Sequence, residues 1–381
     1  MVSLSLSIFT VAMLAAVYFT LGYPLVLAGR AHFFPNPVCK TFFPRTVSVV
    51  MAVRNGDPWI ADKLASILDQ NYPRELVEII VVSDGSTDGT DEIASRFSSY
   101  GVEVLRIESG GKAVALNKGM QRAKGDVLFF NDVRQRIHPD CLRHLVACLG
   151  DPNVGAACGQ TLFLAGEERP HLGMYWRYER WLRRSLSQVD SLLAGTCFFV
   201  VRRDLVEPMP PGTLLDDSWL PLSAFLRGYR FVLDTEAIAW DYPNALRSEF
   251  KRKVRTLAGI YQLVMFRPQL LSAQNRMRFH FISYRLGRVL LPYLLLVAFA
   301  SSFTLSSVVR GPVLGAWLAL LVFALADVVL PEGLSVKLVT SAARTFVVLM
   351  AASFCAVAIF FVPPTTLWQD AWTDKKQVPE V

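Results

Sequence analysis

Apolar stretches with almost no charge stand at both ends of the chain and enclose a polar middle, and this layout limits the possible folds most strongly. Residues 1–29 contain no Lys, Arg, Asp or Glu, and Leu4 to Gly29 is long enough to cross a bilayer. A cleaved signal peptide would have a basic start and a shorter apolar core. We therefore interpret the segment as an uncleaved anchor.

Three further apolar segments lie near the C-terminus, at Val289–Val309, Gly311–Leu330 and Thr345–Val362. Only the middle one contains a charge, Asp327, which we expect to face other helices or to lie near the end of its span. Between residues 246 and 288, ten Lys or Arg residues stand against one acid. Because basic residues mark the cytosolic side, the pattern predicts a multi-pass protein of the cell membrane with its middle in the cytosol.

The overall composition agrees with this layout. Hydrophobic residues make up 52% of the chain and charged residues 19%, which is too apolar for an average soluble protein. A net charge of +7 is compatible with nucleic acid, an anionic membrane or a phosphorylated substrate as partner. The basic residues lie next to the apolar segments, which favours the membrane over nucleic acid. The six cysteines form no Cys-x-x-Cys pair, which argues against a zinc site or a disulfide framework.

The middle of the chain, from Thr46 to about Tyr242, alternates β-branched runs with amphipathic stretches. We expect strands at residues 47–53, 77–82, 102–105 and 126–130, and helices at residues 59–69, 88–99 and 112–123. This alternation predicts an α/β domain with a mostly parallel sheet, inserted between transmembrane helices. In such sheets ligands bind at the carboxyl ends of the strands, so the polar residues there are candidate site residues.

Three polar segments follow predicted strands. Asp84 ends a buried strand, where it either caps the next helix or binds a ribose or a base; we expect Asp88 to be the cap and Asp84 the ligand. Gly110 and Gly111 precede Lys112 at a helix start, which suits a phosphate and equally a plain turn. Asp132 is a candidate ligand for Mg²⁺ or Mn²⁺.

A pair of acids, Asp216 and Asp217, precedes an apolar stretch further along. One of the two carboxylates is a candidate general base, and the alternative is helix N-capping.

Taken in order, these segments resemble glycosyltransferase family 2, the inverting enzymes of the GT-A (Rossmann-like) fold. The resemblance covers residues 47–262 and rests on Val82 through Thr90, Gly111 through Gly119, Asp132, Asp216-Asp217 with Pro221, residues 195–203 and Gly228-Tyr229-Arg230. The arrangement of membrane segments resembles that of polysaccharide-building members.

The resemblance implies a role for each matching residue. Ala52, Arg54 and Asp84 would hold the uridine of a UDP-sugar, and Lys112 would approach the donor. Asp132 would bind the metal that bridges the diphosphate, and Asp217 would deprotonate the acceptor hydroxyl.

Two departures from the family pattern matter. The metal motif Asp-x-Asp reads Asp132-Val133-Arg134 here, so either Asp132 alone holds the metal or Arg134 pairs with phosphate. Processive members carry Gln-x-x-Arg-Trp near the membrane, and the matching place here is residues 252–256, in which Arg252 replaces the Gln and Thr256 the Trp. Arg252 and Arg255 remain candidates for contact with the diphosphate. Without the Trp, a long polymer held in a channel is less well supported.

Residues 171–189 predict an amphipathic helix, with Leu172, Tyr175, Trp176, Leu182, Leu186 and Val189 on one face and Arg177, Arg180 and Arg184 on another. Such a helix suits the membrane interface, and core packing is the alternative.

The predicted organisation is an anchor (1–30), a cytosolic catalytic domain (45–245), basic interfacial helices (246–288), three transmembrane helices (289–362) and a tail (363–381). The predicted function is transfer of one sugar to a lipid-linked or glycan acceptor in envelope or exopolysaccharide synthesis. A processive synthase and, in another class, a transporter or flippase are the alternatives. Whether the chain forms a homo-oligomer stays open.

Overall fold

The computed structural model describes residues 2–163, 170–241, 246–331 and 334–368. The chain divides into two compact units. The sheet unit comprises residues 30–166 and 180–243, and the apolar unit comprises residues 1–29, 167–179 and 244–381.

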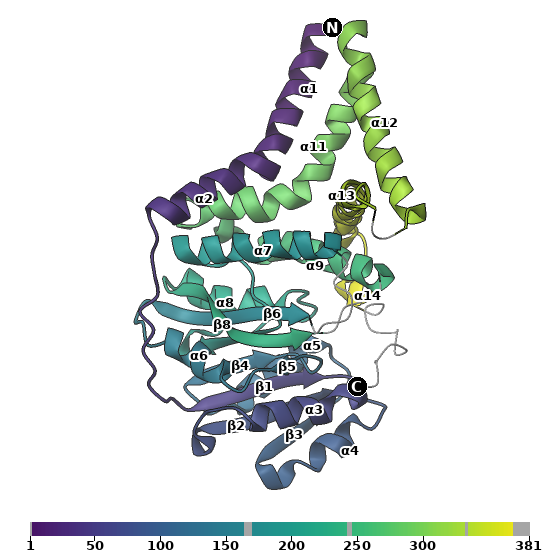
Figure 1. Cartoon of the computed structure of the whole chain (residues 1–381). Coiled ribbons are helices and arrows are strands. Elements are labelled where there is room, and N and C mark those ends of the chain that lie inside the picture. The colour runs from purple at the N-terminus through teal and green to yellow at the C-terminus, as the bar shows by residue number, and fades with distance from the viewer. Residues whose placement is uncertain (1, 164–169, 242–245, 332–333, 369–381) are drawn as a thin grey trace. The chain divides into compact units, whose positions relative to one another are not determined.

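The sheet unit contains an eight-stranded sheet with the order β3-β2-β1-β4-β7-β6-β8-β5 (Figure 1). The strands are β1 (Val47–Val53), β2 (Val77–Asp84), β3 (Val102–Ile107), β4 (Val127–Asn131), β5 (Arg136–Ile137), β6 (Val154–Phe163), β7 (Phe198–Arg202) and β8 (Arg230–Asp241). β3, β2, β1 and β4 are parallel neighbours, and β6 is parallel to β8. β7 runs antiparallel to β4 and β6, and β5 runs antiparallel to β8. The predicted mostly parallel sheet is confirmed.

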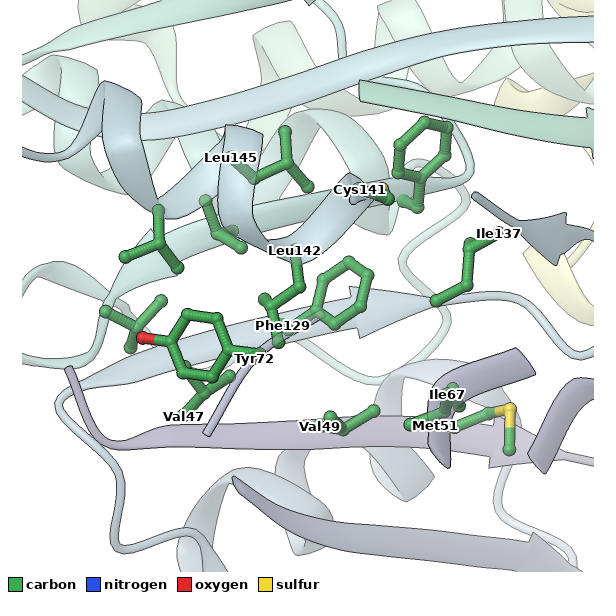
Figure 2. Close-up of a cluster of buried hydrophobic side chains, with 14 of the residues drawn as sticks. Val47, Val49, Met51, Ile67, Tyr72, Phe129, Ile137, Cys141, Leu142 and Leu145 are labelled. Carbon is green, nitrogen blue, oxygen red and sulfur yellow. The ribbon is translucent and has the colours of Figure 1, made fainter. Parts of the chain in front are cut away.

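Helices cover both faces of this sheet. They are α3 (Asp57–Leu68), α4 (Thr90–Ser95), α5 (Lys112–Arg122), α6 (Cys141–Cys148) and α8 (Asp216–Leu226). Leu142 and Leu145 of α6 pack on the side of the sheet where Val49 and Phe129 lie, as Figure 2 shows. On the other side α5 packs against β1 and β2, and a Cβ atom at Gly119 would lie 2.5 Å from Val50. Because both faces are covered, the side chains of β1 and β4 are buried on both sides of the sheet. The two strands are therefore almost continuously apolar in sequence, which is why they could be predicted.

The apolar unit contains four helical segments that are long and apolar enough to cross a membrane, at Leu4–Phe33, Arg278–Ser302, Ser307–Val329 and Lys337–Phe360. Their elements are α1 (Val2–Val17), η1 (Tyr18–Gly22), α2 (Tyr23–Phe33), α10 (Arg278–His280), η6 (Phe281–Leu286), α11 (Gly287–Ser302), α12 (Ser307–Val329), α13 (Lys337–Cys355) and η7 (Ala356–Phe360). The four predicted segments all fall mainly within these helices, but the second, third and fourth begin earlier than predicted, and the second ends at Ser302 instead of Val309.

Asp327 explains why the fourth segment begins earlier. Its carboxylate is 2% exposed and contacts four side chains of α13, namely Lys337 at 3.3 Å, Thr340 at 3.2 Å, Ser341 at 2.5 Å and Arg344 at 3.2 Å. The two charges that kept residues 337–344 out of the predicted span are therefore paired inside the α12–α13 hairpin. Asp327 lies near the end of its helix and faces a neighbouring helix, as predicted.

Two long helices remain. α7 (Pro170–Val189) lies between β6 and β7 in the chain, and α9 (Leu246–Phe266) follows β8. α7 matches the predicted amphipathic helix. Leu182, Leu186 and Val189 are buried, whereas Arg177 and Arg184 are exposed. The side chains of Leu172 and Tyr175 and the tail from residue 369 lie outside the described part of the chain.

Candidate functional site

The carboxyl ends of the parallel strands bring three predicted site residues to one edge of the sheet. Asp84 is the last residue of β2, Asp132 follows β4, and Arg54 follows β1 with an exposed side chain. Ala52 is half-buried in β1, beside Val82 of β2. Since β1 is paired in parallel with both β2 and β4, all of these residues lie at the edge where ligands bind in such sheets.

Asp84 organises the turn that leads into α5. Its carboxylate is 4% exposed and accepts hydrogen bonds from the backbone N–H groups of Gly110 at 2.7 Å and Gly111 at 3.0 Å. Gly111 has φ = 86°, a conformation that side-chain-bearing residues rarely adopt. The two N–H groups that suited a phosphate are therefore hydrogen-bonded to Asp84. The neighbouring Asp88 accepts hydrogen bonds from the N–H groups of Thr90, the first residue of α4, and of Asp57, the first residue of α3. The N-cap residue of α4 is Gly89 and not Asp88 as predicted.

Lys112, the first residue of α5, joins two acids from distant parts of the chain. Its ammonium lies 2.7 Å from the carboxylate of Asp132 and 2.8 Å from that of Asp216. Burial lowers the pKa of Lys112, but the two carboxylates outweigh burial and hold the pKa well above its ordinary value. Lys112 therefore stays charged at neutral pH, and it fixes the two carboxylates around one nitrogen.

Asp216 and Asp217 form the first turn of α8 but differ in their contacts. Asp216 is the acid that pairs with Lys112, and the sequence analysis did not choose it. Asp217 accepts a hydrogen bond from Gly195 N–H through its backbone carbonyl at 2.9 Å, and its carboxylate accepts one from Ser218 Oγ at 3.3 Å. A Cβ atom at Gly195 would lie 2.3 Å from that carbonyl, so this close approach requires glycine.

Arg134, which stands where the family motif has its second acid, pairs with an acid from the last long strand. Its Nη2 atom lies 2.8 Å from Oδ2 of Asp241, the residue that ends β8. The side-chain amide of Gln135 donates to the same oxygen at 3.1 Å. The partners Arg134 and Asp241 are 107 positions apart, and nothing in the local sequence predicted Asp241.

Arg252 and Arg255 lie on α9 in the apolar unit. Arg252 pairs with Glu249 at 2.7 Å, and its guanidinium lies 5.9 Å from the centre of the Trp176 ring. Thr256, which replaces the family's Trp, donates a hydrogen bond to the backbone carbonyl of Arg252. The predicted roles of Arg252 and Arg255 in donor binding stay predictions.

A second acidic cluster lies away from this edge. His144, Asp234 and Glu236 hold ligand atoms within 4.8 Å of one another. The ammonium of Lys40 contacts Asp234 at 3.0 Å and Glu236 at 2.9 Å, so a cation from the chain itself offsets part of the negative charge of the cluster. These contacts tie the segment that precedes β1 to β8.

Comparisons with known proteins agree with one another. A model described as "Glycosyl transferase family 2" matches residues 48–208, and a model described as "Glycosyl transferase family group 2" matches residues 132–362, more than half of the chain.

Two curated relatives match part of the chain. The glycosyltransferase AglE of Haloferax volcanii is 30% identical over 169 residues, which cover 43% of this chain and 55% of that protein. The probable glycosyltransferase YdaM of Bacillus subtilis is 25% identical over 240 residues, 58% of this chain and 56% of that protein. The chain therefore spans about half the length of these relatives.

One solved structure matches nearly the whole chain. It is the mannosyltransferase PcManGT from Pyrobaculum calidifontis, solved in complex with GDP-Man and Mn²⁺. The TM-score is 0.72 at 20% sequence identity, and the match covers 93% of this chain and 99% of that one. At this level of identity the likeness is one of fold.

Proposed function

The chain belongs to glycosyltransferase family 2, and from this premise we propose that it transfers a sugar, with inversion, from a UDP-sugar to a lipid-linked or growing glycan acceptor. It is a glycosyltransferase that uses a nucleotide-sugar donor, and the base of the nucleotide, the acceptor and the site residues belong to the proposal. Its strongest support is the arrangement of Lys112 between Asp132 and Asp216 at the carboxyl edge of the sheet.

In the proposed site the donor lies along this edge. Ala52 and Arg54 line the place of the uridine at the end of β1. Asp84 supports it indirectly, because its hydrogen bonds to Gly110 and Gly111 shape the turn before α5. Lys112 brings a positive charge to the diphosphate, which develops negative charge as the bond to the sugar breaks.

A divalent cation fits the residues at this place. Carboxylate oxygens are the ligands that Mg²⁺ and Mn²⁺ prefer, and Asp132 offers them at this edge, where the ammonium of Lys112 now pairs with Asp132 and Asp216. Asp132 would hold the ion together with the diphosphate. When bound, the ion would neutralise the charge of the leaving diphosphate. Arg134 is engaged with Asp241, so the usual second acid has no direct substitute in the motif.

The reaction needs a base and accurate positioning. The acceptor hydroxyl oxygen attacks the anomeric carbon and forms the new glycosidic bond, while the bond from that carbon to the diphosphate oxygen breaks. The bonding electrons leave with the nucleoside diphosphate, and the hydroxyl proton passes to the carboxylate of Asp217. Attack from the face opposite the leaving group inverts the anomeric configuration.

The four apolar helices support a lipid-linked acceptor. A catalytic unit attached to a membrane draws its soluble donor from the cytosol and meets a membrane-held acceptor at the interface. The proposal therefore locates the protein in the cell membrane with the sheet unit in the cytosol.

One screen tests the function. The purified full-length protein in detergent is incubated with UDP-, GDP- and dTDP-sugars, with and without Mn²⁺, and release of nucleoside diphosphate is measured. We expect one UDP-sugar to be hydrolysed or transferred faster with Mn²⁺. Preference for a GDP-sugar would correct the nucleotide, and absence of turnover with every donor and with membrane-lipid acceptors would contradict the proposal. Product length separates single addition from processive synthesis.

A further inference from the structure

Lys63 of α3 is a buried cation that the proposed reaction has not used. Its side chain is 1% exposed, and its ammonium donates one hydrogen bond, to the backbone carbonyl of Gln135 at 2.8 Å. In the part of the chain that the structure describes, no carboxylate lies within 4.0 Å of this nitrogen. Its neighbours on the same helix, Ile60, Leu64 and Ile67, belong to the apolar core.

A charge in such a place is costly. Burial of an ammonium without a paired carboxylate disfavours folding. A protein with an apolar side chain of similar volume at such a position is usually as stable or more stable. Burial lowers the pKa of Lys63 to about 8, and the nearby Cys197, Asp132, Cys141 and Asp241 oppose that shift. Lys63 is therefore still largely protonated at neutral pH. A buried charge whose hydrogen bond goes to the loop beside a candidate site is typical of a functional position.

The contact of Lys63 lies in the segment that carries the proposed cation ligand. Gln135 is three residues beyond Asp132, and its side chain donates to Asp241, to which Arg134 also donates. The ammonium of Lys63 thus holds the far end of the loop from Asp132 to Gln135 through its backbone. Its charge also attracts the carboxylates of Asp132 and Asp241.

Side-chain hydrogen bonds hold this loop incompletely. Asn131 and Gln135 are each 5% exposed, and both polar atoms of the Asn131 amide and Oε1 of Gln135 have no hydrogen-bond partner. At the near end of the loop the N–H of Asp132 donates to the carbonyl of Cys197 at 3.0 Å, and at the far end Lys63 donates to the carbonyl of Gln135. The hydrogen bond from Lys63 is therefore one of the restraints on the loop that carries Asp132.

We propose that Lys63 is a positioning residue for donor binding: from beneath the loop 132–135 its ammonium fixes Asp132 and adds positive charge under the diphosphate. This inference rests on the proposed function. It predicts that the charge of Lys63 increases the affinity for the donor and does not increase the stability of the fold.

The segment just after α3 offers a matched control. Gln70, which follows α3, donates to the carbonyl of His138 at 2.9 Å and accepts from Leu142 N–H at 2.9 Å. It therefore holds the chain just beyond the loop, farther from Asp132. Lys63→Met and Gln70→Met both replace a polar side chain by an unbranched apolar one.

The test compares the full-length wild type, Lys63→Met and Gln70→Met in detergent. Thermal unfolding, donor KM and kcat are measured, and calorimetry gives the Kd of UDP and of GDP, each with Mn²⁺. We expect Lys63→Met to unfold at the wild-type temperature or above it, with donor KM and nucleotide Kd raised at least tenfold and kcat changed less than threefold. We expect Gln70→Met to unfold at a lower temperature with KM within twofold of wild type.

The possible results separate the claims. A Lys63→Met protein that binds donor like the wild type, or that no longer folds, would overturn the positioning role and make Lys63 a structural residue. A wild type that neither binds UDP or GDP nor turns over any nucleotide sugar would overturn the proposed function, and this inference with it.

Discussion

Asp216 and Asp217 are adjacent acids that differ in their contacts. Asp216 is paired with Lys112, whereas the carboxylate of Asp217 accepts a hydrogen bond from a hydroxyl group, Ser218 Oγ. The proposed reaction assigns the proton of the acceptor to Asp217, and it assigns to Asp216 the positioning of Lys112. Variants of the two acids test this assignment.

Asp217→Asn removes the base without changing the volume of the side chain. We expect kcat to fall about 10²–10⁴-fold, the usual contribution of a general base, while the Kd of the donor changes less than threefold. Transfer assays and calorimetry on the full-length protein check this. Asp216→Asn is the matched variant, and it should raise donor Kd because Lys112 loses one partner. A turnover above one tenth of wild type in Asp217→Asn would exclude Asp217 as the base.

Asp84→Ala removes the acceptor of the two glycine N–H groups before α5. Hydrogen bonds to a charged group contribute about 1.5–3 kcal/mol, so loss of the turn should weaken nucleotide binding about tenfold or more. Calorimetry with UDP and Mn²⁺ measures this. Asp88→Ala, which removes hydrogen bonds to Thr90 at the start of α4 and to Asp57 N–H at the start of α3, should leave the affinity within twofold of wild type. Equal affinities of the two variants would refute the role of Asp84.

The sequence predicted which residues lie at the edge of the sheet, because Asp84 and Asp132 follow continuous apolar strands. It did not predict that Asp216 rather than Asp217 faces Lys112. Neighbouring residues in a helix point about 100° apart, and the rotation of α8 is set by its packing on the sheet. The hydrogen bonds from Gly110 and Gly111 to Asp84 likewise depend on how close two loops come in space.

At the scale of elements, the four strands and three helices before residue 131 could be predicted because each one is visible as a local pattern of apolar and polar residues. β7 and β8 were not predicted. β7 pairs antiparallel with β4 and β6, and β8 pairs in parallel with β6, so both strands depend on partners that are distant in the sequence. The Arg134–Asp241 pair depends on that pairing. It links the loop after β4 to the end of β8.

A double-mutant cycle tests this link. Arg134→Met and Asp241→Asn each remove one charge of a largely buried pair, so each should lower the unfolding temperature. The double variant should lose less stability than the sum of the losses of the two single variants. We expect a coupling free energy between the two side chains of about 1–3 kcal/mol. Thermal unfolding of the detergent-solubilised protein gives the values. Strictly additive losses would show that the two side chains do not stabilise each other.

The α12–α13 hairpin is held by Asp327. Asp327→Leu leaves Lys337 and Arg344 without their carboxylate, so we expect a lower unfolding temperature and aggregation on size exclusion. The triple variant Asp327→Leu, Lys337→Leu, Arg344→Leu removes all three charges and should recover most of the loss, because apolar replacement of a buried ion cluster is usually tolerated. A triple variant as unstable as the single one would contradict this explanation.

At the scale of the whole molecule, the membrane arrangement can be tested with the chain's own cysteines. Cys39 is exposed, between the first apolar helix and β1. If the sheet unit is cytosolic, a membrane-impermeant maleimide should label Cys39 only in permeabilised cells, and Cys39→Ser should abolish that signal. Cys355 lies within an apolar helix, where lipid should shield it. Labelling of Cys39 in intact cells would reverse the predicted orientation.

The insertion of β7 between β4 and β6 has a consequence for biosynthesis. A ribosome releases Lys112 and Asp132 well before α8 and β8 exist, so the emerging polypeptide holds an ammonium with one of its two carboxylates and an Arg134 without its acid. Domains generally fold as units during synthesis. On the proposed function, the donor site is therefore complete only after Asp216 and β8 have been synthesised, and a chain that ends before Asp216 would lack one of the two acids that hold Lys112.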